Sequence, residues 1–216
     1  MAYSIVVVGT SWGGLNALRE LVGKLPADFR VPVVLVQHRH RQSDNLLSTF
    51  LQERTKLEVT EVEDKMPIVP RTVFIAPADY HLLVDRGSFA LSTDPPVRYS
   101  RPSIDVTFYS AADAYGSAAI GVVLTGANAD GSRGLRRIFD RGGLAYVQDP
   151  LTAESPTMPS AALRCVPGAH VQPIGEIAMS LVAVSGDEPI GAPRMPRESV
   201  EEPSEARPRG ASPGAA

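Results

Sequence analysis

The sequence contains very little cysteine and histidine. Cys165 is the only cysteine among 216 residues, so the chain cannot form an intramolecular disulfide, which fits a reducing compartment. Its apolar neighbours, such as Leu163 and Val166, favour a small core residue over a reactive thiol. No group of cysteines and histidines has the spacing of metal ligands. We therefore expect a protein that uses no metal ion.

The chain also lacks a charge excess and a long apolar run. Its net charge is -3, which argues against a surface for nucleic acid or anionic membranes. The first apolar run, Ile5–Val8, is far too short for a signal peptide core or a membrane span, and no basic segment precedes it. We expect a cytoplasmic protein with no nucleic-acid partner and no direct membrane insertion.

The sequence does contain an alternation of short apolar runs and helical patterns. Its first part predicts strands at 5–8, 33–36 and 57–62, separated by helices at about 15–25 and 44–53. This order is typical of an α/β fold that is doubly wound, with a mostly parallel sheet and helices on both faces. An antiparallel β-hairpin around Asp85-Arg86-Gly87 is expected at one edge of that sheet.

The second part of the chain continues the same alternation and then changes in composition. Strands are predicted at 73–75, 120–124 and 144–147, and helices at 104–115, 134–140, 159–165 and 177–184. From about Gly186 large apolar residues nearly vanish, so the segment cannot bury enough surface to offset its ordering entropy. We expect one domain over residues 1–185 and a disordered tail over residues 186–216.

Three of the predicted strands lead into a hydroxyl, an imidazole and a carboxylate. Ser11 follows the first strand, His38 follows the second, and Asp130 lies in the loop after strand 120–124. In open parallel sheets, ligands bind beyond the carboxyl ends of the strands. A serine needs a neighbouring imidazole to take its proton, and the imidazole works best when a carboxylate orients it. These three residues are therefore candidates for acyl-transfer chemistry.

The segment Gly9-Thr10-Ser11-Trp12-Gly13 fits the Gly-x-Ser-x-Gly nucleophile elbow. The helix that follows points free amides at this turn, which favours a developing oxyanion. Alone, the match fits equally well a glycine-rich turn that binds phosphate or packs tightly. His38 favours catalysis, because a dinucleotide-binding fold would end its second strand in Asp or Glu.

Other residues compete for the same roles. His40 and His81 could serve as the base, while His170 lies late in the chain and looks peripheral. Asp79 and Asp105 compete with Asp130 for the carboxylate role, although Asp105 is expected to serve the terminus of its own helix. Asp130 precedes Gly131 and could instead cap the helix that follows it.

Six segments occur in a fixed order along the chain: Gly9–Gly14, Val36–His38, Ile75–His81, Arg101–Val106, Leu124–Gly131 and Met158-Pro159. Taken together, they resemble the catalytic domain of the chemotaxis protein-glutamate methylesterases, the CheB family, and the resemblance runs from about Ile5 to Ala178. The resemblance implies Ser11 as nucleophile, His38 as base and Asp130 as orienting residue. It also implies hydrolysis of glutamyl methyl esters on chemoreceptors, deamidation of certain receptor glutamines, and no cofactor.

Some features depart from the family pattern. Family members usually carry a receiver domain before the esterase, whereas this chain starts at the first esterase strand, so we expect that control to be missing or supplied by a separate receiver-domain protein. Ala127 stands where the family often has Met, and Trp12 where it commonly has a small residue. We expect Trp12, Gly13 and Ala127 to form the oxyanion and substrate pocket.

Two other functions stay open from the sequence. Trp12 and the missing receiver domain motivate a degenerate module that binds a receptor or signalling partner without turnover. The glycine-rich first turn motivates a nucleotide-binding domain.

Overall fold

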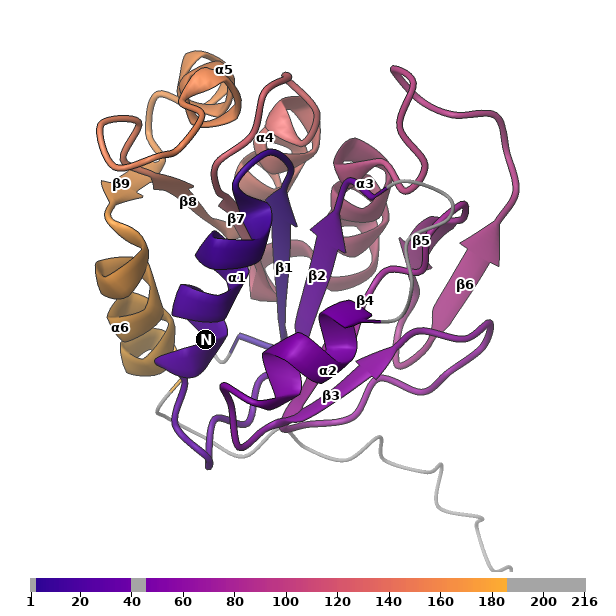
Figure 1. Ribbon diagram of the computed structural model, residues 1–216. Helices are drawn as coiled ribbons and strands as arrows, with labels where there is room; N and C mark the ends of the chain where they lie inside the picture. The colour runs from indigo at the N-terminus through magenta and orange to yellow at the C-terminus, as the bar shows by residue number, and fades with distance from the viewer. Residues whose placement is uncertain (1–2, 40–45, 186–216) are drawn as a thin grey trace, which may run out of the picture.

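The computed structural model describes residues 3–39 and 46–185. They contain a parallel sheet with strand order β3-β4-β2-β1-β7-β8-β9 (Figure 1). The strands are β1 (Ile5–Thr10), β2 (Val33–Gln37), β3 (Glu58–Glu61), β4 (Thr72–Ile75), β7 (Ala119–Val123), β8 (Leu144–Gln148) and β9 (His170–Gln172). Every neighbouring pair in this sheet is parallel, as the alternation of strands and helices predicts.

Helices cover both faces of the sheet, with α1, α2 and α6 on one face and α3, α4 and α5 on the other (Figure 1). Their bounds are α1 (Gly14–Gly23), α2 (Leu46–Gln52), α3 (Ile104–Tyr115), α4 (Ser132–Asp140), α5 (Thr157–Cys165) and α6 (Ile174–Val184), with a short 3-10 turn, η1 (Gly116–Ala118). Successive residues of β1 face opposite cores: Val6 packs with the first helix set and Val7 with the second. Both faces of the central strands are thus buried, which confirms the doubly wound α/β prediction.

The predicted hairpin exists but forms its own sheet. In the part of the chain that the structure describes, strands β5 (His81–Val84) and β6 (Phe89–Ser92) pair only with each other, beside the β3–β4 side of the molecule (Figure 1). Helix α3 takes the backbone groups that β5 would offer to a neighbouring strand: Thr107 donates to the Leu82 carbonyl at 2.8 Å, and the Val84 amide donates to Ser110 at 2.9 Å. The expectation of pairing with the main sheet was therefore wrong.

Most other element predictions agree within a few residues. Strand β9 was missed because His170, Val171 and Gln172 are partly or fully exposed and show no apolar alternation. Helix α6 begins at Ile174, before the predicted start at 177. The predicted start of the second helix at Asp44 and the predicted tail over 186–216 lie outside the described residues. Within residues 3–39 and 46–185, no helix is long and apolar enough to span a bilayer.

The strand order changes direction at β1, which makes this strand the switch point of the sheet. The chain builds outward from β1 through β2 to β4 in one direction, and from β1 through β7 to β8 in the other. Loops after strands on either side of such a switch point diverge and leave a crevice at the carboxyl ends. The residues after β1, β2 and β7 are therefore the ones that meet there.

Candidate active site

Ser11 lies on a tight turn between β1 and α1. Its amide donates to the Thr125 carbonyl at 3.0 Å, which ties the turn to the loop after β7. Gly13 has a φ of 77°, a conformation that side chains disfavour, and it precedes the first residue of α1. At Gly126 an added Cβ would lie 3.0 Å from the Cβ of Ser11. The two glycines therefore allow the close turn and the close approach of the two loops.

His38 directly follows β2 and reaches the same loop. Its amide donates to the Thr10 carbonyl at 3.2 Å, and its Nε2 lies 2.8 Å from Oδ2 of Asp130. The His38 side chain is 13% exposed and that of Asp130 is 1% exposed, so this contact is almost dry. The structure thus brings together an imidazole and a carboxylate that are 92 positions apart in the chain.

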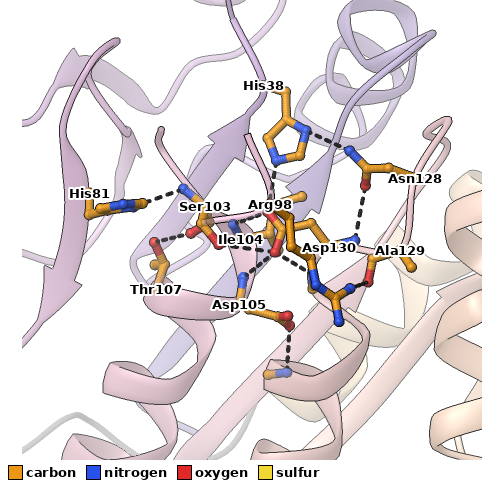
Figure 2. Close-up of polar contacts among 12 residues, drawn as sticks. His38, His81, Arg98, Ser103, Ile104, Asp105, Thr107, Asn128, Ala129 and Asp130 are labelled. Carbon is orange, nitrogen blue, oxygen red and sulfur yellow. Dashed lines mark hydrogen bonds and ion pairs between the residues drawn. The ribbon is translucent and has the colours of Figure 1, made fainter. Parts of the chain in front are cut away.

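Asp130 is held by donors from the start of α3 (Figure 2). Oδ1 accepts from the Ser103 hydroxyl, the Asp105 amide and the Gly131 amide, each at 3.0 Å. Oδ2 accepts from the Ile104 amide at 2.7 Å. The free amides and the dipole at a helix N-terminus favour such an anion. Asp130 therefore serves α3, and the residue that caps α4 is Gly131.

These contacts set the protonation of Asp130. Burial acts to raise its pKa, but the hydrogen bond from His38, the amides of Asp105 and Ile104, and the charge of a protonated His38 act more strongly in sum. The pKa of Asp130 consequently lies below its ordinary value. An ionised carboxylate at this position can hold one tautomer of His38 and stabilise its protonated form.

Ser11 and His38 open into one pocket of about 390 Å³. The residues that line it are Ser11, Trp12, Gly13, Gly14, Leu15, Asn16, Gln37, His38, Ala127 and Glu154. The predicted pocket residues Trp12, Gly13 and Ala127 are thus all in its wall, and Trp12 is 66% exposed at the rim. Among the described residues, no hydrogen bond joins Ser11 to His38, and the backbone amides of Trp12 and Ala127 have no partner. Those amides are available to an oxyanion.

The competing residues are engaged elsewhere. His81 is 2% exposed, and its nitrogens contact the Pro95 carbonyl at 3.1 Å and the Ser103 amide at 3.2 Å. Asp79 accepts from Arg101 at 2.6 Å. His170 lies on β9 and stacks on Tyr146, with ring centroids 5.1 Å apart. His40 lies outside the described residues.

Asp105 lies in the first turn of α3, as expected, but its carboxylate contacts the next helix, α4. Its Oδ1 accepts from the Gly134 amide in α4 at 2.7 Å. Conversely, Asp130 lies just before α4, but its carboxylate accepts from the Ile104 and Asp105 amides at the start of α3. Each acid thus contacts the helix next to its own position, because α3 and α4 pack side by side with their N-termini at the same edge.

Sequence reasoning missed Asn128. Its side-chain amide lies 3.1 Å from Nδ1 of His38, and its Oδ1 accepts from the Asp130 amide at 2.9 Å (Figure 2). An asparagine two residues before an aspartate in a loop is a recognisable Asx-turn signal. That local signal could have predicted the contact with the Asp130 amide, but nothing local points to His38.

The comparisons with known proteins agree on one family. Residues 6–181 match the family model described as CheB methylesterase. A Leptospira interrogans protein named for protein-glutamate methylesterase and protein-glutamine glutaminase activity is 42% identical over 179 residues, which cover 82% of this chain and 93% of that protein. A Carboxydothermus hydrogenoformans protein of the same name is 39% identical over 185 residues, covering 83% of this chain but 54% of that protein.

A solved structure gives the same result. The crystal structure of the Thermotoga maritima CheB methylesterase catalytic domain is 32% identical, with a TM-score of 0.81, and the match covers 85% of this chain and 100% of that one. The strand-end serine, histidine and aspartate thus occur on a fold shared with a known catalytic domain. The chain belongs to the CheB methylesterase family.

Proposed function

We propose that this protein is a serine esterase that removes methyl esters from glutamyl side chains of a methylated chemoreceptor or a similar signalling protein. We also propose that it deamidates glutamine side chains of such proteins. The family and the names of its relatives support this activity. The observation that carries the proposal is that Ser11 and His38 line one pocket while His38 contacts the buried carboxylate of Asp130.

In the proposed reaction, Oγ of Ser11 attacks the ester carbonyl carbon and passes its proton to His38. The tetrahedral oxyanion is stabilised by the backbone amides of Trp12 and Ala127, which have no partner among the described residues. Methanol leaves with the proton from His38, and the glutamyl group stays bound to Ser11. Water then attacks the acyl-enzyme with His38 again as base, which releases the glutamate side chain and restores the serine.

The decisive experiment is methanol release from methylated receptor preparations. Ser11→Ala should lower turnover by roughly a million-fold, as expected when a triad nucleophile is removed. Ser117→Ala is a matched control, because Ser117 is exposed in η1, next to the amino end of β7. Near-full activity in Ser11→Ala would contradict the assignment of the nucleophile.

A non-catalytic module that binds a receptor is the rival function. A fluorophosphonate probe separates the two, since the proposed enzyme should be labelled at Ser11 and a binding module should not be labelled. We further propose a cytoplasmic location and regulation by a separate receiver-domain protein. To test this regulation, a phosphorylated receiver protein captured in a pull-down would be added to the methanol-release assay. A changed rate of methanol release would support the regulation.

A further inference from the structure

We propose that Asn128 is a positioning residue that fixes the tautomer of His38 in the resting enzyme. The inference rests on the proposed function, because it concerns the residue assigned there as the base. Asn128 lies in the loop after β7, and its side chain bridges His38 and the backbone of Asp130 (Figure 2).

The backbone fixes the orientation of the Asn128 amide. The Asp130 amide can only donate, and it lies 2.9 Å from the Asn128 side chain, so the atom that it meets must be the oxygen. The nitrogen of Asn128 then faces Nδ1 of His38 at 3.1 Å. Because a side-chain amide nitrogen also only donates, Nδ1 must be the unprotonated acceptor.

The opposite side of the ring agrees with this tautomer. With Nδ1 unprotonated, the proton of neutral His38 is on Nε2, which donates to Oδ2 of Asp130 at 2.8 Å. Asp130 and Asn128 thus specify the same tautomer from two sides. Nδ1 would then take the proton of Ser11, which lines the same pocket, once the Asn128 amide has released the single lone pair of that nitrogen.

Asn128 also opposes protonation of His38. A doubly protonated ring would point an N–H at the N–H of Asn128, and the amide cannot flip because its oxygen is held by the Asp130 backbone. Asp130 is the charged group that contacts His38, on its Nε2 side. The charged and titratable residues that share a pocket with His38 are Arg39, Arg101 and Tyr99 on one flank and Glu154 on the other. Among these and Asn128, only Asn128 donates to Nδ1.

Two substitutions at one position separate positioning from packing. Asn128→Asp keeps an oxygen for the Asp130 amide but replaces the donor that faces Nδ1 with an acceptor. Asn128→Ala removes both contacts. A neutral hydrogen bond changes a protonation equilibrium about fivefold, or about 0.7 pH unit.

The measurement is the acid limb of the pH dependence of kcat/KM for methanol release. Compared with wild type, the limb should move to higher pH by about 0.7 unit in Asn128→Ala and by more than about one unit in Asn128→Asp. Asn128→Asp also adds a negative charge beside His38, which moves the limb whatever the role of Asn128. The deciding variant is therefore Asn128→Ala, for which a role limited to holding the loop predicts the acid limb of wild type. Coincident acid limbs for wild type and Asn128→Ala would overturn the proposal.

A second readout does not depend on activity. The ¹⁵N chemical shifts of the His38 ring in the full-length wild-type protein at neutral pH should show a protonated Nε2 and an unprotonated Nδ1. In Asn128→Asp, Nδ1 should become protonated at the same pH. The opposite tautomer in wild type would refute the inference even if turnover fails, whereas loss of turnover with the expected spectrum would count against the proposed function alone.

Discussion

Asp130 and Asp105 are two buried carboxylates at the junction of α3 and α4, yet their pKa values shift in opposite directions. Asp130 is 1% exposed and Asp105 is 4% exposed. For Asp105, burial is the largest effect; the Gly134 amide opposes it and the charge of Asp130 adds to it, so its pKa is raised. For Asp130, burial is again the largest single effect, but it is outweighed by its donors.

The difference teaches that the number of donors, and not the depth of burial, decides which acid is ionised. Asp130 accepts hydrogen bonds from three backbone amides, the Ser103 hydroxyl and His38. The Asp105 carboxylate accepts from the Gly134 amide, and the Arg133 amide is the other backbone donor that lowers its pKa. A carboxylate that is surrounded by fixed donors can stay charged beside an imidazole, which is the state that the proposed reaction needs.

Replacing each acid by its amide should give the largest contrast. Asp130→Asn should lower kcat/KM for methanol release by about ten-thousandfold, because an amide cannot hold the required tautomer of His38 or stabilise its charged form. Asp105→Asn should stay within about tenfold of wild type, since Asp105 does not contact His38. Equal losses in the two variants would show that the carboxylates act together and would remove the distinction between them.

Removing one hydrogen-bond donor from Asp130 should raise its pKa toward that of Asp105. Ser103→Ala deletes the buried hydroxyl that donates to Oδ1 and should lower the free energy of unfolding by about 1.5–3 kcal/mol at pH 7 in urea titrations. The lowered pKa of Asp130 contributes stability that is present above its ordinary value of 3.8 and is lost as the pH falls through the folded-state value. The deficit of the variant should therefore shrink in acid, and a deficit that is independent of pH would point to lost packing instead.

The smallest expected effect is a gain in the free energy of unfolding when Asp105 is replaced by Asn. The raised pKa of Asp105 means that its ionised form destabilises the fold at neutral pH, and this cost disappears as the pH falls toward 3.8. Asp105→Asn keeps an oxygen for the Gly134 amide and should raise the free energy of unfolding by about 1 kcal/mol at pH 7. In urea titrations near pH 3.5 the variant and wild type should coincide. A variant less stable than wild type at pH 7 would mean that the charge of Asp105 supports the fold.

Much of the fold was predictable because its signals are local. Helix α3 has the predicted bounds, and the apolar strands β1, β2 and β7 lie within a residue or two of prediction, since full burial on both faces leaves unbroken apolar runs. Strand β9 was missed because it is an edge strand with exposed side chains. The hairpin was predicted from its turn, but its partner could not be, because that depends on hydroxyls of α3.

The sequence by itself determined which strands end in a hydroxyl, an imidazole and an acid, because strand ends follow from periodicity and turn residues. Only the tertiary structure decided that Asp130, and not Asp105 or Asp79, meets His38, because that contact spans 92 positions and depends on how α3 packs against the sheet. It also decided the contact of Asn128 with His38 across 90 positions. Side-chain contacts of this range arise from the packing of distant elements, which no local pattern encodes.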